Sequence, residues 1–248
     1  PPPLFLLACG IAIAAGIVKG TVGFAMPTIL ISGLSSFVSP ELALAGLILP
    51  TLLTNGWQAL RQGTVAARKS IWRFRQFMTA GLIALLLSAQ LVPMLSNQAM
   101  LMLIGIPVAV FGILQLAGWQ LSFQQGAHRW LEVAFGAIVG FIGGLSGVWG
   151  PPTVAYLAAL DTPKQESVRV QGVIYGLGAV ALFSAHLVSG VIRPATLTFS
   201  ISLVPPALLG MWIGLLIHDR IDQKAFRKAT QVVLVVAGLN LIRRGLLG

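Results

Sequence analysis

One lysine stands where its charge is difficult to accommodate. Lys19 is the only basic residue away from the ends of the chain's apolar segments, and it precedes Gly20. A charge inside a membrane costs about 2.5–3.5 kcal/mol on insertion scales, so such a residue is first treated as a functional site. An ammonium group beside backbone N–H groups at a helix terminus is suited to bind an anion. In the alternative interpretation, the long aliphatic stem of Lys19 lets its ammonium group reach a membrane interface.

Lys19 belongs to a glycine–proline motif that occurs twice. The copies are Gly16-x3-Gly20-x2-Gly23-x3-Pro27 and, 124 residues later, Gly140-x3-Gly144-x2-Gly147-x3-Pro151. Gly and Pro interrupt helices and leave backbone groups unpaired. At membrane depth such backbone is tolerated only where protein buries it or where it lines a cavity. Corresponding breaks in two halves of a chain therefore indicate a transporter site, here an asymmetric one because Gly143 matches Lys19.

The candidate site residues follow from these motifs. We expect the anion to bind to Lys19, Gly20, Thr21, Gly23, Gly144, Ser146, Gly147 and Trp149. Pro27 and Pro151 would hold the helix breaks open. The hydroxyl groups of Thr21 and Ser146 either donate to the anion or bond to helix carbonyls. Other polar residues in apolar segments either gate the site, carry a proton or bridge helices, namely Asn55, Gln58, Gln171, Tyr156 and His186.

The acidic residues and the cysteine argue against other chemistries. All six carboxylates fall near segment ends or in loops, namely Glu41, Glu132, Asp161, Glu166, Asp219 and Asp222. This position argues against a carboxylate proton relay or a cation site built from protein oxygens, and it favours an anionic substrate. The single cysteine, Cys9, excludes a cysteine metal cluster and an intramolecular disulfide. We predict no metal site, no cofactor and no enzyme activity.

The composition indicates the class of protein that carries these residues. The chain is 56% hydrophobic and 9% charged, and residues 76–127 and 133–160 contain no Asp, Glu, Lys or Arg. Each run exceeds the roughly 20 residues that one helix needs to cross a bilayer. The segments lack the polar alternation of a membrane barrel, so we predict an all-α integral membrane protein. The basic residues behind the net charge of +10 lie mainly between hydrophobic segments. There they set the orientation of the spans and do not indicate nucleic-acid binding.

The apolar segments divide the chain into two homologous halves. The first repeat, 1–122, holds a broken segment at 4–38 and spans at 42–60, 77–95 and 99–121. The second repeat, 123–248, holds a broken segment at 131–160 and spans at 170–189, 197–217 and 229–247. Each broken segment is expected to form a helical hairpin, either two short spans or a re-entrant loop. The sequence does not predict an oligomeric state.

Loop charge bears on how the two repeats are oriented. If each broken segment returns to its own side the repeats are inverted, and if it crosses once they are parallel. Inversion places twelve basic loop residues inside and three outside, whereas the parallel arrangement gives nine and six. Basic loops favour the cytoplasmic side, so we predict inverted repeats with both termini on the periplasmic side of a bacterial inner membrane.

One motif also admits an enzyme interpretation. Gly144-Leu145-Ser146-Gly147 resembles the Gly-x-Ser-Gly motif of rhomboid intramembrane proteases, and His186 would be the base for Ser146. The first copy of the motif carries Val22 where Ser146 would align, which argues against this alternative. A transporter or channel for another small anion, such as a carboxylate, is the other alternative.

The paired motifs resemble those of the sulfite exporter TauE/SafE family, also called toluene-sulfonate uptake permeases. The resemblance covers the whole chain and includes Gly63-Thr64-Val65 and Gly190-Val191-Ile192 after the next span of each half. It implies a permease that moves a small sulfur-containing anion, such as sulfite or an organosulfonate, across the bacterial inner membrane. Many members place further glycines where this chain has Phe24-Ala25-Met26 and Val148-Trp149-Gly150, so pocket size and substrate do not carry over directly.

Overall fold

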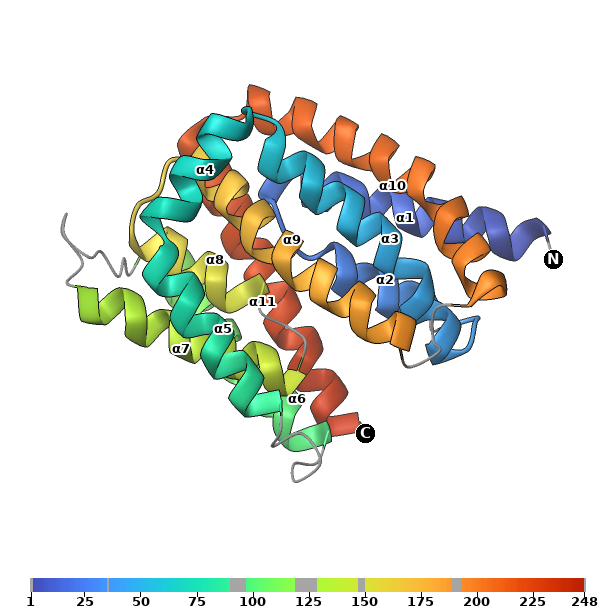
Figure 1. The fold of residues 1–248 in the computed structure, drawn as a ribbon, viewed down its shortest axis with the longest axis horizontal. Helices are drawn as coiled ribbons and strands as arrows, with labels where there is room; N and C mark the ends of the chain where they lie inside the picture. Colours follow the sequence, from blue (N-terminus) through green and yellow to red (C-terminus); the bar gives the residue numbers. More distant parts are fainter. Residues whose placement is uncertain are drawn as a thin grey trace. The chain divides into compact units, whose positions relative to one another are not determined.

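The computed structural model describes residues 2–34, 36–89, 97–118, 129–146, 150–188 and 193–247, and every regular element in these ranges is helical. The helices are α1 (Pro2–Val22), α2 (Met26–Leu34), α3 (Pro40–Leu60), α4 (Thr64–Arg73), α5 (Arg75–Ala89), α6 (Asn97–Leu116), α7 (Arg129–Ser146), α8 (Gly150–Ala159), α9 (Lys164–Val188), α10 (Pro194–Arg220) and α11 (Gln223–Leu247) (Figure 1). The prediction of an all-α protein is confirmed for the described residues.

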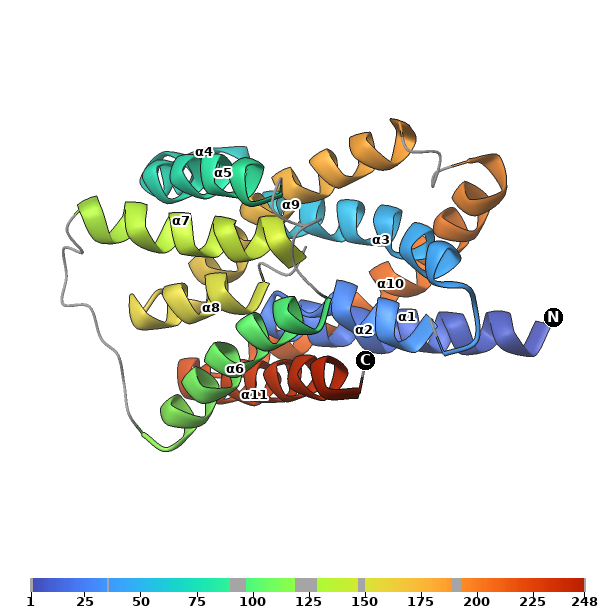
Figure 2. The same ribbon diagram turned by 90° about the horizontal axis from the view of Figure 1, so that it is seen from below.

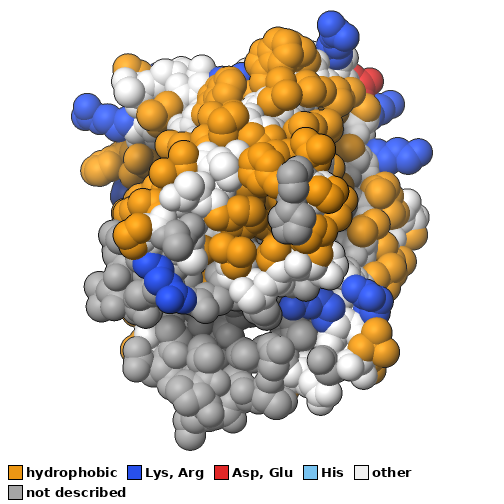
Figure 3. All heavy atoms as spheres, turned by 90° about the vertical axis from the view of Figure 1, so that its right-hand side faces the viewer, with side chains coloured by type: hydrophobic (Ala, Val, Ile, Leu, Met, Phe, Trp, Pro, Cys, Tyr) orange, Lys and Arg blue, Asp and Glu red, His pale blue; other side chains and the backbone are white. Residues whose placement is uncertain are grey.

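Apolar side chains cover much of the helices' outer surface. Three described helices are long and apolar enough to cross a membrane, at Pro3–Val22, Thr196–Arg220 and Gln223–Leu247. Large side chains such as Leu6 and Leu87 are more than 60% exposed. On the face shown in Figure 3 hydrophobic side chains form a broad area with Lys and Arg toward its margins. Lipid is the solvent that such a surface requires.

The first predicted broken segment is a helical hairpin. Helix α1 ends at Val22, α2 begins at Met26, and three residues link them. Helix α2 folds back along α1, since a methyl group added at Gly33 would lie 2.8 Å from the Ile11 side chain. At 1.5 Å per residue α1 is about 31 Å long and α2 about 14 Å, so only α1 has the length of a full span.

The second broken segment is also divided. Helix α7 ends at Ser146 and α8 begins at Gly150, and residues 147–149 lie outside the described residues. Pro27 and Pro151 each occupy the second residue of the helix after the break. Proline suits this first turn because its missing N–H has no helical acceptor there. The two prolines thus start short helices.

Helix α4 lies in a stretch that the sequence predicted only as a basic loop. Gly63, with φ +88°, reverses the chain and α4 follows. Its exposed residues include Arg68, Lys69 and Trp72, whereas Ser70 is 2% exposed. The helix thus has a basic outer face and a buried face. Packing of the buried face, rather than helix propensity alone, stabilises this short helix.

The chain packs as two compact units, each built from both halves of the sequence. Unit 1 consists of Pro1–Ala67 and Val168–Asp222, and unit 2 of Arg68–Ser167 and Gln223–Gly248. These units describe packing, whereas the predicted repeats 1–122 and 123–248 describe sequence similarity. The repeat assignment therefore stays a prediction.

In unit 1, glycines bring α1 and α10 into direct contact along a parallel pair (Figures 1 and 2). A methyl group added at Gly16 would lie 2.7 Å from the Met211 nitrogen, and one at Gly214 would lie 2.8 Å from the Gly20 Cα. Such small-residue faces are how membrane helices pack where lipid offers no hydrophobic driving force. The Gly16-x3-Gly20 pattern is therefore a packing motif, matched by Gly210-x3-Gly214 on α10.

The remaining helices of unit 1 pack around this pair. A buried apolar core joins α1, α2, α3 and α10 and includes Ala12, Leu30, Ile48 and Leu203. Helix α9 runs antiparallel to α3, because Gly172 faces Ala59 and Gly176 faces Asn55.

Unit 2 also contains one parallel and one antiparallel pair of helices that meet at glycines. Helices α5 and α7 form a parallel pair in which Gly136 lies against the Phe77 backbone and Gly140 against Gly81. Helices α6 and α11 form an antiparallel pair, since contacts run from Gly105–Ile242 through Ala109–Gly238 to Gly112–Val235 (Figure 2). Glycine again permits both approaches.

Candidate functional site

The link between α1 and α2 holds two residues in left-handed backbone conformations. Gly23 has φ +95° and Ala25 has φ +73°. The Gly23 N–H donates to the Lys19 carbonyl oxygen at 2.7 Å, which completes the last turn of α1. Alanine at positive φ is strained by roughly 1–2 kcal/mol, and such strain often accompanies functional sites.

Lys19 is buried at this break. Its side chain is 1% exposed, and its ammonium donates to the Oδ1 atom of Asn55, which is fully buried on α3. In the described part of the chain no carboxylate pairs with Lys19, and the Nδ2 group of Asn55 has no hydrogen-bond partner. The pair therefore holds unused donors in a buried position, which is costly unless another group accepts from them.

Two glutamines surround the same break. Gln58 Nε2 donates to the Gly23 carbonyl oxygen at 3.0 Å and to the Val168 carbonyl oxygen at 2.6 Å. The Gln171 amide lies beside Gly23, where an added methyl group would come within 2.5 Å of Oε1. Both glutamines are at most 2% exposed. Lys19, Asn55, Gln58 and Gln171 thus form a buried polar cluster around Gly23, which we call the Lys19 cluster.

Helix dipoles act in opposite directions on the Lys19 cluster. Lys19 lies in the last turn of α1, whose negative dipole end favours an ammonium group. The N-terminus of α2 begins three residues beyond Gly23, and its positive end favours an anion. The C-terminal end of α1 thus stabilises the buried cation, and the N-terminal end of α2 adds positive potential beside it.

The depth of the cluster follows from helix lengths. Asn55 precedes Arg61, at the charged end of α3, by six residues, or about 9 Å of helix axis. Gly214 beside Gly20 precedes Arg220 by the same number. The cluster therefore lies inside the apolar layer, on the side marked by these arginines and about 6 Å short of the midplane of a bilayer core about 30 Å thick.

Other predicted residues of the first motif have structural roles. Gly20 packs against α10. The Thr21 hydroxyl donates to the Ile17 carbonyl oxygen at 2.9 Å and approaches that of Gly214 at 3.4 Å. Of the two roles expected for Thr21, the structure has the bond to helix carbonyls.

His218 lies close to this motif, although it is not among the site residues that the sequence predicts. It is 1% exposed, and its Nδ1 atom is 3.1 Å from the Thr21 carbonyl oxygen, a hydrogen bond that requires the proton on Nδ1. Its position next to Asp219 and Arg220 at the end of an apolar segment resembles an ordinary loop residue, so no sequence signal marked it.

The second motif is only partly described. Gly147 and Trp149 lie outside the described residues, as do the side chains of Ser146 and His186, so the Ser146–His186 alternative is untested. Gly144 lies within the last turn of α7. The structure therefore brings together predicted residues of the first motif, and it leaves the corresponding part of the second motif as a prediction.

Tyr156 packs in an aromatic stack within unit 2. Its ring lies 4.7 Å from that of Phe77 and 5.2 Å from that of Phe135, and the side chain is 1% exposed. The Tyr156 hydroxyl has no hydrogen-bond partner in the described part of the chain. Stacking explains why Tyr156 is buried, and its hydroxyl stays available as a donor.

Comparison with known proteins gives one relative, from Bacillus subtilis (strain 168), described as "Probable membrane transporter protein YunE". It is 26% identical over 132 residues, which is 52% of this chain and 46% of that protein, so the chain spans less than half of the relative's length. No solved structure matches the chain. The model of the sulfite exporter TauE/SafE family matches residues 8–241, nearly the whole sequence, and the protein belongs to that family.

Proposed function

We propose that this membrane protein is a secondary transporter that moves a small sulfur-containing anion, of the sulfite or organosulfonate type, across a bacterial inner membrane. The observation that carries the proposal is the buried ammonium of Lys19, which has the neutral Asn55 oxygen as its partner. A cation without a counter-ion in a low-dielectric site attracts an anion strongly. A sulfur oxyanion bound there would supply the missing charge.

The donors of the Lys19 cluster suit an oxyanion. The ammonium has three N–H donors, of which Asn55 accepts one, and Asn55 Nδ2 is buried without an acceptor. An oxyanion presents several acceptor oxygens and could use both residues together. A carboxylate offers the same chemistry with fewer oxygens, so the sulfur specificity rests on the family description rather than on this cluster.

Transport requires that the buried site open to each side in turn. We propose that the two repeats are inverted and that rocking between them provides alternating access. In support, the equivalent helices α3 and α9 are antiparallel within unit 1, and the equivalent helices α6 and α11 are antiparallel within unit 2. Inversion requires equivalent helices to point in opposite directions, whereas parallel repeats require the same direction.

An ion pair in unit 1 supports the same arrangement. Arg61 at the end of α3 pairs with Asp219 at the end of α10. Inverted repeats place these two ends on one side of the membrane, and parallel repeats place them on opposite sides. The basic residues of both loops make that side the cytoplasmic one.

Anion binding by the purified protein tests the proposed substrate. Titrations followed by thermal shift or calorimetry would compare sulfite, thiosulfate, sulfate, taurine, sulfoacetate and a carboxylate of matched size. We expect selective, saturable binding of a sulfur anion that Lys19→Met weakens at least tenfold. Equal affinity for the matched carboxylate would replace the sulfur assignment with a general anion transporter, and no binding to any compound would remove the proposed function.

Labelling from one side of the membrane tests the inverted arrangement. Gln62 and Asp222 are exposed at the ends of α3 and α10, and Cys9→Ala removes the native thiol. In that background Gln62→Cys and Asp222→Cys should both resist a membrane-impermeant maleimide in spheroplasts and react after permeabilisation. If Asp222→Cys reacts in intact spheroplasts while Gln62→Cys does not, the repeats are parallel.

A further inference from the structure

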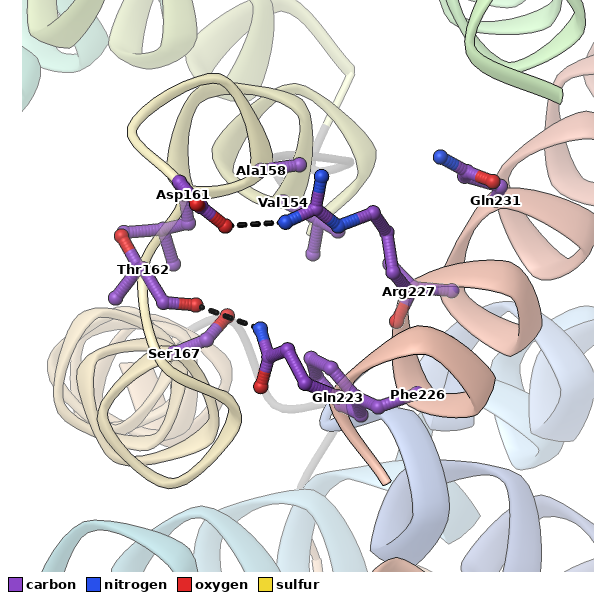
Figure 4. Close-up of a pocket in the computed structure, with 11 residues that line it drawn as sticks. Val154, Ala158, Asp161, Thr162, Ser167, Gln223, Phe226, Arg227 and Gln231 are labelled. Atoms are coloured by element: carbon purple, nitrogen blue, oxygen red, sulfur yellow. Dashed lines mark hydrogen bonds and ion pairs between the residues drawn. The ribbon is translucent and has the colours of Figure 1, made fainter. Parts of the chain in front are cut away.

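Unit 2 contains a polar pocket of its own, separate from the Lys19 cluster. It lies between the link from α8 to α9 and the first turns of α11 (Figure 4). Val154 and Phe226 form part of its apolar wall, and Asp161, Thr162 and Arg227 contribute polar groups. Figure 4 shows Asp161 on the link and Arg227 on α11 reaching toward each other, and Gln223 reaching the Thr162 carbonyl oxygen.

The wall of this pocket is held by a glutamine. Gln223 Oε1 accepts from the Lys164 backbone N–H at 3.0 Å, at the start of α9. Gln223 Nε2 donates to the Thr162 carbonyl oxygen at 3.4 Å. Asp161 turns the link with φ +49°. Because both ends of one side chain bind the link, the pocket is built into the fold and is more than a gap between loops.

Two buried hydroxyl groups in the pocket wall have no partner. Thr162 is 5% exposed and Thr230 is 4% exposed, and neither Oγ1 atom makes a hydrogen bond in the described part of the chain. A threonine within a helix commonly bonds to a carbonyl one turn earlier, which Thr230 does not do. Leaving a buried hydroxyl unpaired costs about 1–3 kcal/mol, so both groups are suited to donate to a ligand.

Arg227 lines the same pocket as these two threonines and supplies its positive charge. Its guanidinium pairs with Asp161, whose side chain is 70% exposed. An ion pair so open to water contributes only about 0–1 kcal/mol, so another anion can displace the carboxylate at little cost. The guanidinium fork has five N–H donors in a geometry that matches phosphate and sulfate oxygens. The positive end of α9, which starts at Lys164, adds to the same potential.

We infer that the pocket binds a tetrahedral oxyanion of the sulfate or phosphate type through Arg227 and the hydroxyls of Thr162 and Thr230. In the absence of the anion, the Asp161 carboxylate pairs with the guanidinium, and it competes with the anion for this position. A free anion and the phosphate of an anionic lipid headgroup share this chemistry. The site is independent of Lys19 and does not rest on the proposed transport function.

Titration with inorganic sulfate and phosphate tests the site, using protein in phosphatidylcholine nanodiscs with and without Lys19→Met. A separate arm adds phosphatidylglycerol to the nanodiscs. Thr230→Val, which keeps the side-chain shape, should weaken binding at least fivefold. Asp161→Asn should tighten it about threefold or more, because it removes the competing charge and asparagine tolerates the left-handed backbone. Thr198→Val is the matched control, since that exposed hydroxyl bonds to the Pro194 carbonyl oxygen.

The outcomes separate this site from the Lys19 cluster. Binding that persists with Lys19→Met and responds to Thr230→Val and Asp161→Asn in opposite directions supports the inference. If the free anions bind in this way, the ligand is a soluble anion, and if only phosphatidylglycerol stabilises the protein with the same variant pattern, it is a lipid headgroup. The inference is overturned if Lys19→Met abolishes binding, if neither Thr230→Val nor Asp161→Asn changes the affinity, or if no binding is detected in either arm.

Discussion

Replacing Lys19 by methionine separates the binding role of the ammonium from its effect on stability. Methionine has a similar length and no charge. The substitution leaves Asn55 Oδ1 without its donor, which costs about 1–3 kcal/mol. It also removes a buried ammonium whose desolvation costs several kcal/mol in a protein. The second effect is the larger, so the ligand-free variant should melt at the wild-type temperature or above it.

The effect on binding has the opposite sign. A hydrogen bond to a charged group contributes about 1.5–3 kcal/mol, and each 1.4 kcal/mol changes Kd tenfold. Lys19→Met should therefore raise the Kd for sulfite by about tenfold to about a hundredfold. At an anion concentration of about 100 times the wild-type Kd, ligand stabilises the wild type by about 2.7 kcal/mol. The same concentration should stabilise the variant by about 1.4 kcal/mol or less.

Thermal unfolding with and without sulfite measures both quantities in one experiment. Lys69→Met is the matched control because that lysine is exposed on α4. The control should keep the full ligand-induced shift. If sulfite stabilises Lys19→Met as much as the wild type, the ammonium does not bind the anion, and the argument from its burial is refuted.

Other substitutions test the packing and the helix break by thermal unfolding. Gly214→Ala, whose methyl group would lie 2.8 Å from the Gly20 Cα of α1, should cost about 1–3 kcal/mol. Gly10→Ala, with nothing within 4 Å, should cost nothing, and equal losses would contradict the packing assignment. Gly23→Ala should destabilise the protein and weaken anion binding, because its methyl group meets a buried amide at φ +95°. Ala25→Gly should gain about 0.5–1 kcal/mol by relieving φ +73°, and a loss there would show that the alanine is unstrained. Arg61→Gln removes a partly exposed ion pair and should cost less than about 1 kcal/mol, with no cost at high salt.

The sequence predicted the helical class and the first break because both depend on local properties. A membrane span needs a long apolar run, and glycine at 23 with proline at 27 ends one helix and starts another. Lys19 could be identified for the same reason, since a charge within such a run has few structural explanations.

The predictions were incomplete wherever a residue's role depends on a distant partner. Gly20 was interpreted as a source of free backbone donors, but Gly20 and Gly16 pack against α10, nearly 200 residues later in the chain. Gln58 was noted only as a polar residue, and its bonds to Gly23 and Val168 depend on how α3 meets α1 and α9. Helix α4 was missed because dense positive charge suggested a loop, and its buried face became evident only from packing.

Unit 1 is assembled from two separate stretches of the chain, which has a consequence for biosynthesis. Helices α1, α2 and α3 enter the bilayer early, yet their partners α9 and α10 are translated after a further stretch, Arg68–Ser167, that belongs to unit 2. Until α10 has been inserted, the glycine face of α1 and the buried ammonium of Lys19 must be shielded by lipid, by the translocon or by a chaperone. A ribosome that stalls between the two halves would therefore release a nascent chain that cannot complete either unit, and quality-control proteases should recognise it as an orphan.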